Sequence, residues 1–459
     1  MQGGERLSDL RLRAAAAHQS GDLETAYSGY LAFLAQAPDD AGIWSNLGVL
    51  FRARGQHEMA LRAQERAMVL APDDDGIRGN LANILSDTGG YDRSIALRQD
   101  LLTRKPGDSM HMAMIGRCLR GQGRYAAAVD WLAPRAEAHP QEPELRLQLA
   151  FALLGAGRYG AGFDAYDARW SCGELTLREM PYPRWRPGMD IAGKRVLVTP
   201  EQGFGDCVLM ARFVAELARR GARVWLLTEK PLDRLLSRLD GTEWSGIALS
   251  AETGIDCWMT VFDMPRLVWG PEETGPPPPP ARLTLPDGSR QRARAIAAPF
   301  KDRFKVGVVW SGSATYKGNA FRSFGHADYL PLAELPDVQL FSLYKGPFLD
   351  AYIADGSAAF MIDAAGTDRD FADCAATMAE MDLVITSDTA TSHIAGSLGI
   401  EVWTVLHWDP FWVYRHSGDG TDWYPSMRLF RQTEPRNWSP VFARIRAELE
   451  TKIATWRSA

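Results

Sequence analysis

The sequence has few cysteines, and they follow no recognisable pattern. Among 459 residues there are five, and no two of them form a CxxC pair. An odd number of scattered cysteines argues against a disulfide framework and against a cysteine-based zinc site. We therefore expect a protein of a reducing compartment. The five are Cys118, Cys172, Cys207, Cys257 and Cys374.

Long apolar runs and an excess of basic charge are also missing. No stretch approaches the roughly 18 uncharged apolar residues of a membrane helix, and the first residues, MQGGERLSDLRLRAAAA, contain no continuous apolar segment of signal-peptide type. The formal net charge is -6, whereas nucleic-acid binders usually present a basic face. We expect a cytoplasmic protein that neither inserts into a membrane nor binds nucleic acid.

The first third of the chain contains a repeat of 34 residues, marked by glycine and proline. In a helical hairpin the glycine relaxes the turn between the helices and the proline ends the second helix. One hairpin cannot bury its apolar face alone, so the units must stack. The pattern resembles tetratricopeptide (TPR) repeats, about five of them over residues 7–172, in a helical domain that we bound at 1–175. The recurring residues are Gly21, Gly55, Gly89, Gly123 and Gly157, with Pro38, Pro72, Pro106 and Pro140.

The rest of the chain alternates strand-like and helix-like segments. KRVLVTP, RVWLLT, VGVVW, VQLFSL, DLVIT and VWTVL are separated by amphipathic stretches, which is typical of parallel sheets covered by helices. The proline run within residues 275–281 predicts a stiff spacer. We therefore predict two α/β lobes, at 176–298 and 299–459, with a ligand site in the cleft between them.

Three segments follow strands and could carry chemistry. The first, PEQGFGD, has glycines that let the loop turn tightly and approach a ligand, with Gln202 and Gly205 as candidate contacts. Asp206 closes it. This carboxylate either caps the following helix or takes a proton from an acceptor hydroxyl.

The second segment, VGVVWSGSATYKGNAFRS, combines hydroxyl donors with two cations. Such a set suits a diphosphate, although it could also be an ordinary solvated loop. The candidate ligands are Ser311, Ser313, Lys317, Arg322 and Ser323.

The third segment, DLVITSDTATSHIAGSLG, predicts a buried strand that ends in a helix N-terminus, where backbone N–H groups attract anions. Asp388, Thr389, Ser392 and His393 would face the ligand there. The alternatives are a capping role for Asp388 and an internally hydrogen-bonded His393.

These segments, with DFADCAATMAEM and TDWYPSMRLFRQ, resemble bacterial TPR-containing glycosyltransferases whose catalytic region is similar to the ADP-heptose:lipopolysaccharide heptosyltransferases. The resemblance implies a GT-B fold and inverting transfer from a nucleotide-sugar without a metal or other cofactor. It makes Asp206 the catalytic base and places Asp388, Thr389 and His393 in the donor-binding segment.

Two acidic residues could instead suggest a metal site. Asp368 and Asp370 form the DxD pair with which metal-dependent transferases hold a divalent cation. Because the pair immediately precedes the helical segment FADCAATMAEM, we predict that Asp370 caps that helix.

The same resemblance indicates a protein acceptor held in the groove of the repeats, with flagellin as the favoured one. Asn46 and Asn80 share a repeat position that in protein-modifying members contacts the acceptor backbone. The alternative for both is an ordinary polar surface residue, since Met114 and Gln148 follow at this position. Two other functions stay open: a TPR adaptor with an inactive transferase region, and a lipopolysaccharide-core transferase.

Overall fold

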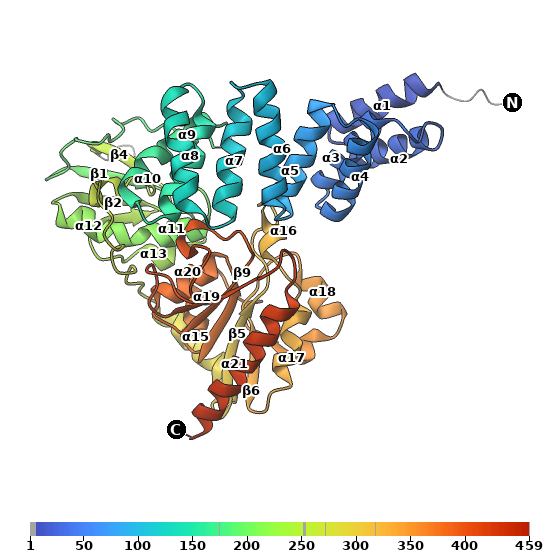
Figure 1. Ribbon diagram of the computed structural model, residues 1–459. Helices are drawn as coiled ribbons and strands as arrows, with labels where there is room; N and C mark the ends of the chain where they lie inside the picture. Colours follow the sequence, from blue (N-terminus) through green and yellow to red (C-terminus); the bar gives the residue numbers. More distant parts are fainter. Residues whose placement is uncertain (1–5, 174, 251–253, 271, 317, 459) are drawn as a thin grey trace. The chain divides into compact units, whose positions relative to one another are not determined.

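The computed structural model describes residues 6–173, 175–250, 254–270, 272–316 and 318–458. Contacts divide the chain into two compact units, residues 1–152 and 153–459. This division comes earlier than the domain boundary predicted at residue 175, and it falls within the fifth repeat. The predicted fold class, a helical repeat region followed by α/β lobes with parallel sheets, is confirmed (Figure 1).

Paired helices make up the first unit, and each pair forms one hairpin. Their order follows the 34-residue period, with one hairpin per repeat. The helices are α1 (Leu7–Gln19), α2 (Leu23–Leu34), α3 (Ala41–Ala53), α4 (His57–Leu70), α5 (Asp75–Asp87), α6 (Tyr91–Arg104), α7 (Ser109–Gly121), α8 (Tyr125–Ala138) and α9 (Pro143–Gly155), which crosses the division.

Each hairpin turns at its repeat glycine. All five glycines have φ between +72° and +82°, the left-handed conformation that glycine adopts without strain. The residue after the glycine donates its N–H to a carbonyl five positions back, for example Gln56 to Phe51 at 2.8 Å, which completes a Schellman motif. An aspartate with the same period stands at the start of the second, third and fourth hairpins, where Asp40, Asp74 and Asp108 accept backbone N–H groups of α3, α5 and α7. Turn and cap together explain why the repeat length is constant.

The second unit opens with the rest of the fifth repeat, α10 (Tyr159–Ala165) and the 3₁₀ helix η1 (Tyr166–Ser171). These elements pack on the α/β region through aromatic side chains. Tyr159 accepts a hydrogen bond from Trp423 Nε1 at 3.1 Å, and its ring centroid lies 4.7 Å from that of Trp269. Since Trp269 belongs to the first lobe and Trp423 to the second, α10 contacts both lobes.

The first lobe is a four-stranded sheet of order β3-β2-β1-β4, in which every pair is parallel. Its elements are β1 (Arg195–Thr199), α11 (Phe204–Met210), η2 (Ala211–Phe213), α12 (Val214–Arg219), β2 (Arg223–Leu227), α13 (Asp233–Leu236), β3 (Thr242–Gly246), β4 (Cys257–Thr260) and α14 (Pro265–Val268). A segment that contains the proline run, without helix or strand in its described part, then leads to α15 (Asp287–Ala297) and η3 (Ala298–Phe300).

The second lobe is a six-stranded parallel sheet of order β10-β9-β8-β5-β6-β7. Its central strands are apolar and buried, as expected for a sheet covered on both faces. The elements are β5 (Phe304–Val309), α16 (Asn319–Arg322), η4 (His326–Tyr329), α17 (Leu330–Ala333), β6 (Val338–Ser342), α18 (Leu349–Ala354), η5 (Ser357–Ala359), β7 (Met361–Asp363), α19 (Phe371–Met378), β8 (Leu383–Ser387), α20 (Ala390–Ser397), β9 (Val402–Leu406), η6 (Trp412–Tyr414), β10 (Met427–Arg431) and α21 (Ser439–Ser458).

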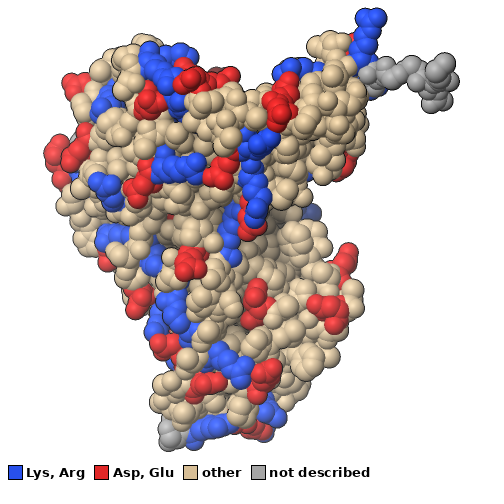
Figure 2. All heavy atoms as spheres, turned by 45° about the vertical axis from the view of Figure 1, so that its right-hand side comes forward, with Lys and Arg blue, Asp and Glu red and all other residues tan. Residues whose placement is uncertain are grey.

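The two lobes meet where α11 packs against α20 and where α13 and α15 pack against α19. Within the described ranges, none of the helices combines the length and the hydropathy that a membrane span requires. On the face that Figure 2 presents, Lys and Arg side chains are interspersed with Asp and Glu side chains.

Candidate active site

The PEQGFGD loop follows β1 and runs into α11. Gln202 has φ +62°, unusual for a residue other than glycine. Gly203 is the N-cap, and its N–H donates to Asp206 Oδ2 at 3.0 Å. Asp206 is therefore the third residue of α11, and its side chain accepts a hydrogen bond from the N-cap residue of this helix. This hydrogen bond holds the Asp206 carboxylate in one orientation.

Gly205 lets the two lobes approach each other at this loop. A Cβ at this position would lie 3.0 Å from His393 Cδ2 and 3.3 Å from the Cα of Ala390. Both partners belong to the start of α20 in the second lobe. Gly205 is therefore required for close packing of α11 on α20, and its predicted contact with a donor stays a prediction.

The second lobe supplies Asp388 between β8 and α20. Its side chain is buried, as are those of Thr389, Ser392 and His393. The Thr389 hydroxyl pairs with that of Thr391 at 2.7 Å, and the Ser392 hydroxyl lies 2.9 Å from the Tyr414 hydroxyl. His393 Nδ1 lies 3.2 Å from the Tyr424 hydroxyl. The three neighbours of Asp388 are thus engaged within the protein.

The hydroxyl-rich loop after β5 is closed by internal hydrogen bonds. The Ser311 and Ser323 hydroxyls lie 2.9 Å apart. Asn319, which the sequence did not single out, donates to Ser311 at 3.0 Å and accepts from the Gly312 N–H at 3.1 Å. This network holds both ends of the loop together.

Two further candidates of this loop differ in their placement. The Ser313 hydroxyl lies 2.8 Å from that of Thr315, close to the loop surface. The Arg322 guanidinium stacks on the Tyr316 ring, 4.6 Å from its centroid, and within the described residues its Nε has no hydrogen-bond partner. Lys317 lies outside the described residues.

Asp206 and Asp388 converge from the two lobes, with Arg322 beside them. Burial raises the pKa of Asp206 to about 7; the nearby charges of Asp388 and Glu201 add to this, while the Gly203 N–H and Arg322 oppose it. Burial also raises the pKa of Asp388, again opposed by Arg322. At neutral pH the Asp206 carboxyl therefore changes easily between its protonated and charged forms, as a general base must.

His393 has the opposite behaviour. Burial lowers its pKa to about 3, and the positive charges of Arg212 and Arg322 act in the same direction. The imidazole is therefore neutral at physiological pH. Arg212 itself is buried and donates to the backbone carbonyls of Trp423 and Pro278 at 2.9 and 3.0 Å.

Sequence reasoning missed the residues of the fifth repeat that reach this site. Arg169 forms a bidentate ion pair with Glu201, at 2.7 and 2.9 Å, and Gln202 Nε2 donates to the Tyr166 hydroxyl at 2.6 Å. Glu201 lies inside the quoted motif, but nothing local in the sequence shows which distant cation pairs with it.

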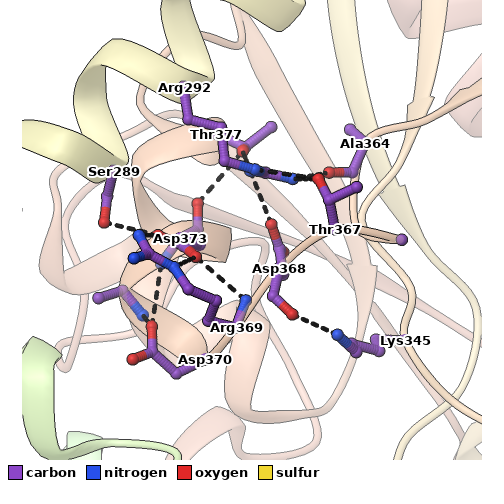
Figure 3. Close-up of polar contacts among 12 residues, drawn as sticks. Ser289, Arg292, Lys345, Ala364, Thr367, Asp368, Arg369, Asp370, Asp373 and Thr377 are labelled. Atoms are coloured by element: carbon purple, nitrogen blue, oxygen red, sulfur yellow. Dashed lines mark hydrogen bonds and ion pairs between the residues drawn. The ribbon is translucent and has the colours of Figure 1, made fainter.

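The DxD pair lies in a network of ion pairs (Figure 3). Asp370 accepts the N–H groups of Ala372 and Asp373 at the start of α19, so the predicted cap is confirmed. Asp370 also lies 3.1 Å from Arg234 of the first lobe. Asp368 lies 2.8 Å from Arg292, although burial still raises its pKa to about 7. Within the described residues, no three His, Cys, Asp or Glu side chains are placed to hold a metal ion.

In the repeat unit, Asn46 and Asn80 are both half-buried. Asn80 Nδ2 donates to the Ser45 hydroxyl at 3.1 Å, which links α5 to α3. This bond gives Asn80 a structural role, and acceptor binding by the two asparagines stays a prediction.

Comparison with known protein families identifies the N-terminal region of the chain. Residues 8–169 match the family described as "Tetratricopeptide repeat". The N-terminal region is therefore an array of TPR repeats. The match includes Tyr166 and Arg169, which contact the PEQGFGD loop.

Individual proteins match other shares of the chain. The sequence is 25% identical to Protein FlbA of Caulobacter vibrioides over 327 residues, which cover 64% of this chain and 53% of FlbA. The chain thus spans about half the length of this relative. Among solved structures it is similar to the glycosyl transferase family 9 protein from Veillonella parvula, at 15% identity and a TM-score of 0.40 over 53% of this chain and 87% of that chain. It is also similar to MamA protein, at 14% identity and a TM-score of 0.32 over 38% of this chain and 98% of that chain.

Proposed function

We propose that this protein is an inverting glycosyltransferase of the GT-B type, which moves a sugar from a nucleotide-sugar donor to a protein acceptor bound by the TPR array. One observation supports the proposal most strongly: Asp206 of the first lobe and Asp388 of the second lobe lie near each other, and the pKa of Asp206 is about 7. A carboxyl with such a pKa is suited to accept a proton near neutral pH.

In this proposal Asp206 removes the proton from the acceptor hydroxyl. The hydroxyl oxygen attacks the anomeric carbon from the face opposite the leaving group, so the C–O bond to the diphosphate breaks and the configuration inverts. The hydrogen bond from Gly203 holds the carboxylate in one orientation during this step. Product with the anomeric configuration opposite to that of the donor, observed by NMR, is the expected outcome.

The donor diphosphate would bind near Asp388, at the start of the eight-residue helix α20. The diphosphate would be bound by the N-terminal backbone N–H groups of this helix and by the adjacent Arg322 guanidinium. These groups would stabilise the negative charge that develops on the leaving group. Arg322 also has a free Nε within the described residues, so it can take up a phosphate oxygen.

We propose that the transfer needs no metal ion or other cofactor. The reason is that the side chains of the DxD pair already have partners: Asp370 caps α19, and Asp368 pairs with Arg292. Recruiting either residue to a cation would break an existing contact.

The acceptor would be a protein, because TPR arrays bind other proteins. Flagellin is the acceptor that the sequence resemblance favours, with Asn46 and Asn80 as candidate contacts. A useful test incubates the purified chain with flagellin and a panel of nucleotide-sugars and measures intact protein mass. A mass increase of one sugar residue supports the proposal. Donor binding without any transfer would instead favour the TPR adaptor.

Donor placement is tested separately by titration with nucleoside diphosphates in a calorimeter. Asp388→Ala combined with His393→Ala is expected to weaken binding at least tenfold, since both residues lie at the proposed donor site. Unchanged affinity in a folded double variant would exclude this placement.

A further inference from the structure

The carboxyl end of the first lobe's sheet is occupied by a buried cation from the fifth repeat. Arg169 is 2% exposed. Its Nε and Nη2 donate to the two carboxylate oxygens of Glu201, which follows β1. Nη2 also lies 3.5 Å from Asp263, which follows the neighbouring strand β4. Arg169 therefore joins the ends of two adjacent strands at the edge of the sheet where ligands of such lobes bind.

Glu201 is at the start of the loop that carries Asp206. The next residue, Gln202, has a positive φ, and such a conformation persists only when surrounding contacts impose it. The contacts are visible: Gln202 Nε2 donates to the Tyr166 hydroxyl at 2.6 Å and to Glu201 Oε1 at 3.0 Å. Gln202 is therefore held by Tyr166, which belongs to η1, and by Glu201, which Arg169 of η1 binds.

The constraint continues to the carboxylate. Gln202 is followed directly by Gly203, whose N–H bonds Asp206. A change in the backbone at Gln202 would reorient this N–H, and with it the Asp206 side chain. Arg169 is thus connected to Asp206 by hydrogen bonds and by the peptide bond between Gln202 and Gly203.

We propose that Arg169 is a positioning residue, which holds Glu201 and the strained Gln202 so that Asp206 is oriented toward the acceptor hydroxyl. This inference rests on the proposed function of Asp206. It makes the C-terminal end of the TPR region part of the catalytic machinery, in addition to any role of the array in binding a partner.

Arginine is needed for this role because its planar fork meets both oxygens of one carboxylate. Lysine keeps the charge but offers a single ammonium group, so it can hold only one oxygen in a fixed direction. Glutamine removes the charge and leaves the buried Glu201 without its cation, which destabilises the fold. Comparing the lysine and glutamine variants therefore distinguishes an effect on the orientation of Glu201 from an effect on the stability of the fold.

The test compares Arg169→Lys, Arg169→Gln and the double variant Arg169→Gln/Glu201→Gln in the full chain. The double variant has no unpaired buried charge, so its melting temperature is expected to return toward that of the wild type. It also has no bidentate clamp, so its kcat is expected to stay at least tenfold below wild type with the KM for the donor nearly unchanged. Arg169→Lys is expected to show the same split and serves if Arg169→Gln does not fold.

The matched control is Arg184→Gln. Arg184 contacts the same Asp263 at 3.4 Å, is less buried than Arg169 and has no contact with Glu201 or Gln202 among those described. Its loss is expected to lower the melting temperature slightly and to leave kcat unchanged. A kcat that recovers in parallel with the melting temperature in the double variant would overturn the positioning role.

A readout independent of activity is hydrogen exchange of peptides that span residues 200–210. Exchange of the amides at 202–206 is expected to rise in the Arg169 variants and to stay at the wild-type level in Arg184→Gln. Wild-type exchange in the Arg169 variants refutes the inference whatever the protein's activity. Faster exchange in a protein that transfers no sugar would retain the constraint and refute the glycosyltransferase proposal.

Discussion

At the scale of single residues, Asp206 has two roles that a sequence cannot separate. One carboxylate oxygen accepts the Gly203 N–H at the helix start. The group also lies beside Asp388 in surroundings that raise its pKa to about 7. A carboxylate that served only as a cap would gain nothing from such surroundings, because hydrogen bonding at a helix start favours the charged form.

Asp206→Asn distinguishes the two roles. Asparagine can still accept the Gly203 N–H but cannot take up a proton, so transfer is expected to fall by roughly 100-fold or more with donor affinity retained. Kinetics and calorimetry measure the two effects.

The melting temperature serves as the control for folding. The wild type loses stability as the pH rises from about 4 to about 7, because the pKa of Asp206 is raised in the folded state. Asparagine does not titrate, so the melting temperature of the variant minus that of the wild type is expected to be larger at pH 8 than at pH 4. A fully active, folded variant would leave Asp206 as a cap alone.

The same pKa predicts the pH dependence of transfer. The base acts in its deprotonated form, so kcat/KM is expected to rise by about tenfold per pH unit up to about pH 7 and then to level off. Because Asp206 and Asp388 interact, the measured midpoint belongs to the pair. Loss of this dependence in the residual activity of Asp206→Asn would support the assignment, whereas a midpoint near pH 4 in the wild type would contradict it.

Asp206, Asp388 and Arg322 lie near one another, while the roles predicted for them stay predictions. Asp206 and Asp388 each lie in the loop or first helical turn that follows a strand of a parallel sheet, which is a relation that the sequence shows locally. Ser311 and Ser323, expected as phosphate ligands, are bonded to each other. The contact of Arg169 with Glu201 spans 32 residues and two kinds of structure, so no periodic pattern could reveal it.

At the scale of elements, the hairpins are defined by a few backbone positions. The repeat glycines were predictable because a left-handed turn of fixed spacing needs glycine at each turn, and all five have positive φ. Small residues on the helices have a different reason. A Cβ at Gly48 would lie 2.7 Å from the Gln64 side chain, so this position is set by the distance between α3 and α4.

Gly55→Ala tests the turn without any steric effect. A Cβ at Gly55 meets no described atom within 4 Å, but its φ of +72° is unfavourable for alanine. We expect a loss of about 1 kcal/mol in the free energy of unfolding, seen as a fall of a few degrees in melting temperature. The matched control is Gly107→Ala, where the surroundings are equally open and φ lies outside the left-handed region. Equal effects of the two substitutions would show that backbone conformation does not limit the turn.

At the scale of the whole molecule, the end of the repeat pattern in the sequence and the division between the compact units do not coincide. The repeat pattern continues to residue 172, yet the compact unit of the α/β lobes begins at residue 153. The cause lies in α10 and η1, whose Tyr159 and Arg169 contact residues that follow by 264 and 32 positions. Helical periodicity identified these segments as a repeat but contained no information about these partners.

Truncation at two places tests this division. A fragment of residues 143–459 keeps the α9–α10 hairpin and is expected to fold, to bind a nucleoside diphosphate like the full chain, and to lose modification of a protein acceptor. A fragment of residues 173–459 lacks Tyr159 and Arg169, leaves Glu201 without its cation, and is expected to aggregate or to melt about 10 °C lower. Circular dichroism and calorimetry measure both. Two fragments of equal stability would show that the fifth hairpin is dispensable.

The incorporation of the fifth hairpin into the lobes gives the array a fixed end and a variable end. The second, third and fourth hairpins each begin at an aspartate cap and turn at a glycine with positive φ, so gene duplication or deletion in steps of 34 codons can lengthen or shorten the array at these hairpins. The last hairpin is tied to one partner surface and cannot be exchanged for another copy. We therefore expect proteins that descend from this one to differ in the number of N-terminal hairpins and to keep the hairpin next to the loop of Asp206.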